Sequence, residues 1–252
     1  MYIPELVAHR GYAARYPENT LPALAAALQI GAPYVEFDVQ LSRDGVPVVI
    51  HDAALARTAG CPGEVFDMTA TELERVVVGE AERFGAQFCD VTIPTLDAAV
   101  ELLRRWPHAH AFVEIKRESV RRHGTEAVVR SVLEVLRPVA ARAVVISFDA
   151  EVLRRARADG ATRVGWVFEG WQDAAREEAA ALQPEFLFTD HREIPSEVER
   201  LWPGEWQWVL YDITEAELAL SWAARGAALI ETWAIGDMLG HPLLGQRRAS
   251  DR

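Results

Sequence analysis

The chain has 252 residues, 50% of them hydrophobic, and a formal net charge of −12. This length suits one large domain and is close to the usual size of a single α/β barrel. The acidic balance argues against a nucleic-acid partner, because proteins that bind nucleic acid usually show a basic face. It does not exclude a phosphate site, since a bound divalent cation and a few placed side-chain cations can invert the local field.

The sequence predicts a cytoplasmic protein. No run of about 18 apolar residues is present, so no transmembrane segment is expected. The first residues lead into strand-like sequence without a basic and then apolar leader, so no signal peptide is expected. Cys61 and Cys89 are therefore predicted to be free thiols rather than a disulfide. No pattern marks an oligomer interface, and the oligomeric state is left open.

Short apolar runs alternate with helical stretches along the chain. The predicted strands are residues 6–9, 34–40, 111–116, 144–148, 164–168, 186–189, 208–211 and 228–232. The predicted helices are residues 20–30, 96–106, 126–136, 151–158, 172–182 and 215–224. Alternating units of this number favour a closed parallel barrel, with an open doubly wound sheet as the alternative. No glycine-rich dinucleotide or P-loop motif supports the open sheet.

Residues 53–93 interrupt this alternation. They contain one helix candidate, residues 69–78, in which Thr69 and Glu72 fit a capping box. The short polar tail from Gly240 is expected to fray.

A β-hairpin is predicted after the second strand. Asp44-Gly45 between two extended stretches indicates a two-residue turn. Counting back from this turn pairs Asp38 with His51 on one face. Glu36 lies on the same face, because strand side chains alternate with period two. The hairpin is therefore expected to gather two carboxylates and one imidazole.

Polar residues also end the first strand, and together these side chains indicate a reaction. His9 and His51 supply a general acid and base near neutral pH. Glu36 and Asp38 suit a hard cation, and Arg10 fits a phosphate. Strand ends are where parallel α/β folds carry their active sites. The pattern is typical of a metal-assisted phosphodiester cleavage.

Glu114 and Lys116 stand two residues apart at the end of the third predicted barrel strand, so both face one way. Glu114 is predicted as a third metal carboxylate and Lys116 as a phosphate contact. A simple salt-bridged strand end is the alternative. Ligands that are all oxygen favour one Mg²⁺ or Ca²⁺ over zinc.

The chain resembles the glycerophosphodiester phosphodiesterase family in the order and spacing of its motifs. These motifs are His9-Arg10-Gly11, Pro17-Glu18-Asn19-Thr20, Gly31-Ala32, Glu36-x-Asp38-Val39, Asp44-Gly45, His51-Asp52, Glu114-x-Lys116 and Ser147-Phe148-Asp149. The resemblance implies a TIM (β/α)8 barrel, a divalent metal, and hydrolysis of small-molecule glycerophosphodiesters to glycerol 3-phosphate and an alcohol. It also assigns Arg10 to the phosphate, and it identifies residues 53–93 as a short insertion. We expect this insertion to act as a partial lid over the substrate head group, with an ordinary surface excursion as the alternative.

The C-terminal third departs from the family pattern. The last strand ends in Glu231-Thr232-Trp233, where the family usually has Thr-Asp followed by proline. Glu231 is expected either to add a carboxylate near the metal or to bind a cationic head group. Trp233 and Trp166 are candidates to stack on a choline-like ammonium, and packing is the alternative for both.

Other activities stay open at this point. One alternative is phospholipase-D-like cleavage of lysophospholipids or sphingolipids, and another is a non-catalytic barrel that binds phosphoesters. The pair of histidines argues against the second, because binding alone does not need it. The preferred head group, the metal, the roles of the two histidines and the choice between a cyclic phosphate and direct attack by water are left open.

Overall fold

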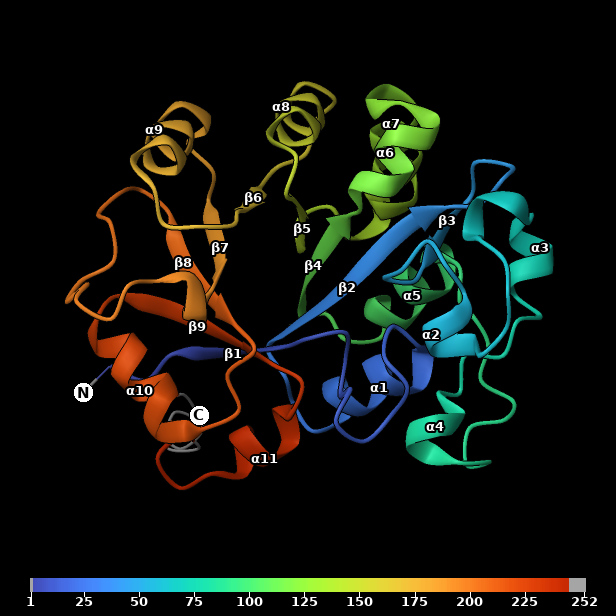
Figure 1. Cartoon of the computed structure of the whole chain (residues 1–252), viewed down its shortest axis with the longest axis horizontal. Helices are drawn as coiled ribbons and strands as arrows, with labels where there is room; N and C mark the ends of the chain where they lie inside the picture. Colours follow the sequence, from blue (N-terminus) through green and yellow to red (C-terminus); the bar gives the residue numbers. More distant parts are fainter. Residues whose placement is uncertain (1, 245–252) are drawn as a thin grey trace.

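The strands of the computed structural model, which describes residues 2–244, form a closed barrel (Figure 1). Within that range eight parallel strands follow the order β1-β9-β8-β7-β6-β5-β4-β2, and a β1–β2 pairing closes the ring. The strands are β1 Glu5–Ala8, β2 Tyr34–Leu41, β4 His110–Ile115, β5 Ala143–Ser147, β6 Val164–Val167, β7 Phe186–Asp190, β8 Gln207–Tyr211 and β9 Ala227–Thr232. The predicted TIM barrel is confirmed, and the open doubly wound sheet is wrong.

Helices surround the barrel and cover the outer face of its strands (Figure 1). Those predicted from the sequence are α1 Leu21–Gln29, α5 Leu96–Arg104, α7 Thr125–Leu136, α8 Ala150–Ala158, α9 Asp173–Leu182 and α10 Ala216–Ala224. Thr20 caps α1, because its side chain accepts a hydrogen bond from the backbone N–H of Ala23. Prediction missed the shorter helices α2 Ala56–Ala59, α4 Ala81–Phe84, α6 Arg117–His123 and α11 Ile235–Gly240. Each offers too few turns for a clear apolar period.

The barrel lumen is filled by two kinds of side chain. Its apolar part includes Val7 on β1, Phe112 on β4 and Leu229 on β9. Two residues further along each strand the side chain on the same face is polar or charged, at His9, Glu114 and Glu231 in the same order. The apolar layer therefore forms a floor beneath a polar layer at the carboxyl ends of the strands.

The hairpin forms, but its predicted register is wrong by one residue. Strand β3, Pro47–Val49, pairs antiparallel with β2 so that Val39 faces Val49. Ser42 N–H donates to Val46 O at 3.0 Å, which leaves a three-residue loop that ends at Gly45 with φ 76°. This is the longer hairpin turn with a left-handed glycine rather than the two-residue turn.

Asp38 consequently does not pair with His51. Ile50 N–H donates to Asp38 O at 3.0 Å, and His51 lies beyond the end of β3. Gln40 Nε2 donates to His51 O at 3.0 Å and holds the chain where it leaves the strand. His51 therefore reaches the carboxyl end of the barrel through the segment after the hairpin and not through strand pairing.

Residues 53–93 lie beside β3 and α1 and carry a small core of their own (Figure 1). Leu55, Val65 and Leu73 pack there against Val48 of β3. The predicted helix 69–78 is much too long, since α3 spans only Ala70–Leu73, with a 3-10 helix, Val65–Asp67, before it. The capping box of α3 is confirmed. The chain after α3 instead becomes extended, and Val77 bridges Thr92.

Two other predictions can be compared with the part of the chain from residue 2 to 244. No helix in it is long and apolar enough to cross a membrane. Cys61 and Cys89 are free thiols, as predicted. Two further 3-10 helices, Arg137–Val139 and His191–Glu193, were not predicted. Of the tail from Gly240 that was expected to fray, residues 245–252 lie outside the described residues.

Gly11 carries the turn that follows β1, and its replacement tests that turn. Gly11 and Gly45 both have positive φ, of 81° and 76°. A Cβ on Gly11 would lie 2.6 Å from the backbone carbon of Ala23, whereas one on Gly45 would meet no atom within 4 Å. We expect Gly45→Ala to lower the free energy of unfolding by about 1 kcal/mol through strain alone. Gly11→Ala should lower it by several times as much, because α1 must move.

Urea unfolding followed by circular dichroism measures both losses. Equal losses in the two variants would contradict the close approach of Gly11 to α1.

Candidate functional site

Three buried carboxylates gather at the carboxyl ends of β2 and β4. Asp38 and Glu114 are register partners on these neighbouring strands, and Glu36 shares the inner face of β2 with Asp38. One oxygen from each of Glu36, Asp38 and Glu114 lies within 4.8 Å of the others. The sequence prediction that these side chains come together is therefore confirmed as geometry. Such a group of oxygen atoms is able to hold a hard cation.

Two cations border this acidic group. Lys116 Nζ lies 2.8 Å from Glu114 Oε1 and 3.3 Å from Asp38 Oδ1. Arg10 Nε lies 3.1 Å from Asp38 Oδ2, and Arg10 Nη1 donates to Glu18 Oε1 at 2.9 Å. The salt-bridged arrangement considered for Glu114 and Lys116 is thus present. Arg10 and Lys116 both line the same cavity as Glu36 and Glu114.

The pKa values of the two β2 carboxyl groups are shifted in opposite directions. Burial alone raises the pKa of Asp38, but the Lys116 and Arg10 cations outweigh it and the net pKa is lowered. Burial also raises the pKa of Glu36, and repulsion from Asp38 and other carboxylates raises it further. Asp38 is therefore held as an anion, whereas Glu36 carries much of the uncompensated repulsion.

Asn19 fixes the orientation of Asp38. Asn19 Nδ2 donates to Asp38 Oδ2 at 2.8 Å, and the backbone N–H of Asp38 donates to Asn19 Oδ1 at 3.0 Å. Asn19 therefore anchors the loop after β1 to β2, and Thr20 is the helix cap.

His9 stands between two carboxylates. Its Nδ1 lies 3.3 Å from Asp212 Oδ1, and its Nε2 lies 3.9 Å from Glu36 Oε2. Burial alone lowers the pKa of His9, but the carboxylates of Glu231 and Asp212 outweigh it and the net pKa is raised. Asp212 was not predicted, although it directly follows β8 and so occupies the same kind of strand end as His9.

His51 is held by a chain of ion pairs that begins in the insertion. His51 Nδ1 lies 2.5 Å from Asp52 Oδ1, and Arg57 Nε donates to Asp52 Oδ2 at 2.6 Å. Both terminal nitrogens of Arg57 donate to Glu18, each at 2.8 Å. Asp52 therefore both orients His51 and ties down the loop through Arg57. Glu18 and Arg57 were missed, because no local pattern reveals a partner 39 residues away.

Backbone strain is concentrated at this end of the barrel. Among the described residues, five that are not glycine have positive φ, and four of them border the site: Arg10, Asn19, Glu80 and Asp212. The turn at Arg10 brings its backbone N–H onto Glu36 Oε2 at 3.0 Å. Strained residues of this kind persist where surrounding contacts hold them, and such places are often functional.

Two cavities share His9 and Arg10 in their walls. An inner cavity of about 200 Å³ has Glu36, Glu114 and Glu231 among its polar wall and Ile146, Phe148, Val167 and Phe188 as its apolar wall. An outer cavity of about 400 Å³ is lined by His9, Arg10, Ala13, Ala14, Glu18, Arg83, Asp212 and Trp233. The space combines a charged side with a carbon-rich side, as expected for a small polar organic ligand.

The two tryptophans proposed for head-group stacking have different positions. Trp233 is 47% exposed and lines the outer cavity, so it is available to a ligand. Trp166 faces outward from β6, where it stacks on Phe168 in the buried layer outside the lumen. The suggestion that Trp166 contacts a ligand is therefore wrong.

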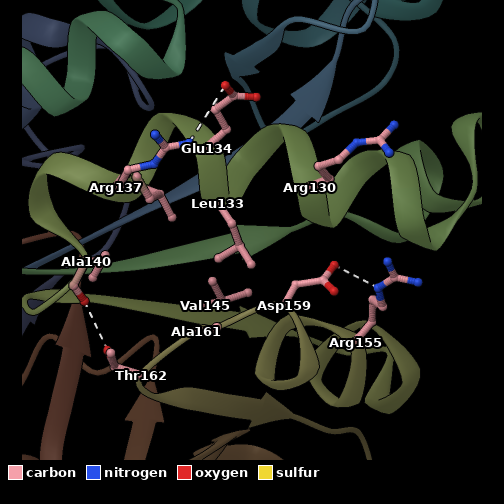
Figure 2. A pocket seen from close by; sticks show the side chains of 13 residues that line it. Arg130, Leu133, Glu134, Arg137, Ala140, Val145, Arg155, Asp159, Ala161 and Thr162 are labelled. Atoms are coloured by element: carbon pink, nitrogen blue, oxygen red, sulfur yellow. Dashed lines mark hydrogen bonds and ion pairs between the residues drawn. The ribbon is translucent and has the colours of Figure 1, made fainter.

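A larger groove of about 560 Å³ lies outside the barrel between α7 and α8 (Figure 2). Its charged side chains already pair with neighbours: Arg137 lies 3.9 Å from Glu134, and Arg155 donates to Asp159 at 2.7 Å. None of the residues drawn in Figure 2 is a buried charged group like those in the barrel lumen. The groove offers no comparable chemistry.

The fold and the site together define a (β/α)8-barrel protein with an acidic cavity at the carboxyl ends of its strands. The sequence profile of the glycerophosphoryl diester phosphodiesterase family matches residues 9–199. The chain belongs to this family, which confirms the resemblance drawn from its motifs.

Individual relatives agree with this assignment. A glycerophosphodiester phosphodiesterase from Bacillus altitudinis is 40% identical over 131 residues, 52% of each chain. The chain therefore spans about half the length of this curated relative. Among solved structures, a phosphodiesterase from Oleispira antarctica in complex with sn-glycerol-3-phosphate shares 26% identity with a TM-score of 0.81, covering 94% of this chain and 95% of that one. A glycerophosphodiester phosphodiesterase from Agrobacterium tumefaciens shares 25% identity with a TM-score of 0.74, covering 95% and 100%.

The pKa of Asp38 is lowered on folding and that of Glu36 is raised, so replacing each carboxyl group should change the free energy of unfolding in opposite directions. At pH 7 in EDTA, Asp38→Asn should lower the free energy of unfolding by about 1–3 kcal/mol, because it removes a charged partner of Lys116 and Arg10. Glu36→Gln should raise it. A carboxyl whose pKa is raised on folding destabilises the folded state above its ordinary pKa, and the neutral amide relieves that cost.

Thermal unfolding of the two variants beside the parent protein measures the difference. A loss of stability in both would contradict the assignment of the repulsion to Glu36.

Proposed function

We propose that the chain hydrolyses glycerophosphodiesters to glycerol 3-phosphate and an alcohol with the aid of one divalent cation. The observation that carries this proposal is that His9 and His51 line one cavity with the Glu36 and Glu114 carboxylates and the Lys116 ammonium. A pair of histidines is suited to moving protons between two oxygens of a phosphodiester. Family membership supports the same reaction.

The donor set fits a divalent cation. Glu36, Asp38 and Glu114 offer oxygen ligands within 4.8 Å of one another. Burial raises the pKa of Glu36, and repulsion from Asp38 and Glu114 raises it further, so the side-chain cations do not fully compensate this buried acidic group. Glu36, Asp38 and Glu114 would hold the ion, and ligands that are all oxygen favour Mg²⁺ or Ca²⁺. When bound, such an ion polarises a phosphoryl oxygen and stabilises the charge that develops on it.

The protein's own side chains perform the remaining steps. Arg10 and Lys116 attract the phosphate into the cavity. One histidine takes a proton from the attacking oxygen, and the other gives a proton to the oxygen of the departing group. Asp212 supports His9 and Asp52 supports His51, since each carboxylate contacts the Nδ1 atom and so leaves Nε2 available for proton transfer. The attacking oxygen belongs either to water or to the substrate's glycerol, and a cyclic phosphate would form only in the second case.

The histidine roles predict a sharp loss of activity. With Mg²⁺ or Ca²⁺ present, His9→Ala and His51→Ala should each lower kcat by about 10²- to 10⁴-fold for glycerophosphocholine. His108→Ala is the matched control and should change nothing, because His108 is exposed at the amino end of β4. EDTA should abolish the activity, and Glu36→Ala should lower the response to added metal.

Release of glycerol 3-phosphate from glycerophosphocholine, glycerophosphoethanolamine and glycerophosphoglycerol measures these effects and ranks the head groups. Phosphorus NMR of the reaction detects a cyclic phosphate. The proposal fails if folded protein releases no glycerol 3-phosphate with Mg²⁺, Ca²⁺ or Mn²⁺.

We further propose that the chain is a single domain and that residues 53–93 act as a partial lid over its active site. Three of their side chains contact the loop after β1: Arg57 binds Glu18, Glu80 accepts from Glu18 N–H at 2.6 Å, and Arg83 Nη2 donates to Ala13 O at 2.6 Å. Arg83 and Trp233 both line the outer cavity. We assign this outer cavity to the head group, with Trp233 as its aromatic wall. The cytoplasmic location stays a prediction.

The lid assignment predicts an effect on substrate affinity. Arg83→Ala should raise KM several-fold with little change in kcat, because the residue borders the head group and not the phosphate. Arg75→Ala is the control, since Arg75 is exposed in the same insertion and lines neither cavity. Steady-state kinetics with glycerophosphocholine gives both constants. A fall in kcat with unchanged KM would instead make Arg83 part of the reaction centre.

A further inference from the structure

Glu231 carries a buried carboxylate oxygen without a hydrogen-bond partner. The side chain is 3% exposed, and its Oε1 atom contacts no donor among the described residues. Native proteins leave few buried polar atoms unpaired, because each one forfeits its hydrogen bonds to water. A carboxylate in this state calls for a donor that comes from outside the protein.

The neighbouring cations do not supply that donor. Lys116 lies against Glu114 and Asp38, and Arg10 lies against Glu18 and Asp38. His9 is near, since one of its ring nitrogens and one Glu231 oxygen lie within 4.8 Å, but its Nδ1 is directed to Asp212. Glu231 Oε1 is therefore a buried acceptor in the cavity wall to which no described residue donates a hydrogen bond, although His9 lies close enough for an electrostatic interaction.

The shape of the inner cavity suggests what the donor is. Glu231 points into the lumen from β9 and lines the cavity beside His9 and Glu36. Ile146, Val167 and Phe188 form the apolar wall of the same cavity. A space of about 200 Å³ with an acceptor on one side and hydrocarbon on another fits a short polyol, whose carbons pack while its hydroxyl groups donate.

We propose that Glu231 accepts a hydrogen bond from a free hydroxyl of the substrate's glycerol moiety and so selects phosphodiesters whose glycerol is not acylated. This inference rests on the proposed function and adds a specificity-determining residue to it. An acyl chain on that hydroxyl removes the donor, leaves the carboxylate unpaired and adds volume to a cavity of only about 200 Å³. Lysophospholipids acylated at that hydroxyl are therefore poor substrates for this chain.

Analogues that each lack one glycerol hydroxyl test the contact. In the parent protein, one of the two deoxy analogues of glycerophosphocholine should lose about 10- to 100-fold in kcat/KM. Glu231→Leu should lose a similar factor with glycerophosphocholine and nothing further with that analogue, whereas Glu231→Gln, which keeps an acceptor oxygen, should lose less. Equal losses with every substrate, or faster cleavage of lysophosphatidylcholine than of glycerophosphocholine by the parent protein, would overturn the proposal.

A binding measurement separates this inference from the reaction itself. Calorimetry with Mg²⁺ alone should give the same affinity for the parent protein and Glu231→Gln, and a lost Mg²⁺ site would make Glu231 a metal ligand instead. Glycerol 3-phosphate should bind the parent protein more tightly than propanediol phosphates do, and Glu231→Leu should remove that preference. If no glycerophosphodiester is cleaved, the proposed function fails, while this preference still decides the role of Glu231.

The melting temperatures of the variants show whether they are correctly folded. Removal of an unpartnered buried carboxylate should leave the melting temperature of Glu231→Leu equal to or above that of the parent protein. A clear fall would mean that Glu231 has a structural partner, and the proposal would be wrong.

Discussion

Repulsion between carboxylates buried in one barrel lumen is the constraint on which the carboxyl end of this molecule depends. Glu36, Asp38 and Glu114 come from two adjacent strands, and Glu231 approaches Glu36 from a third. Buried like charges need opposite charges or protons nearby. Lys116 and Arg10 provide part of that compensation from the ends of β4 and β1. Burial, with repulsion from neighbouring carboxylates added to it, still raises the pKa of Glu36 and raises that of Glu231 to about 7.

Much of the fold and part of the site follow from periodicity and from strand ends. Parallel strands bring their carboxyl ends to one side, so His9, Glu36, Asp38 and Glu114 meet without any long-range information in the sequence. The alternation of side chains then decides which of them face the lumen. This alternation does not reveal which β6 side chains face the lumen, because every residue of β6 is buried. Trp166 of this strand faces the helices.

The failures of prediction share a physical cause. Asp44-Gly45 is compatible with two hairpin loops, and the left-handed Gly45 at the end of a three-residue loop shifted every pair by one position. His51 reaches the cavity nevertheless, because Asp52 and Arg57 hold it from outside the hairpin. Contacts of this kind join side chains far apart in the sequence, and no local pattern encodes them.

The anchors of the insertion divide it into two parts with different freedom to change. Arg57, Glu80 and Arg83 all contact residues 13–18, whereas the chain between Gly60 and Gly79 packs in a small core that it shares with Val48 and Ile50. Loops on a rigid barrel tolerate exchange better than the strands that carry them. The solvent-facing positions of the intervening segment can therefore change while its anchors keep Arg83 and His51 in place, so that sequence change there is decoupled from the reaction chemistry.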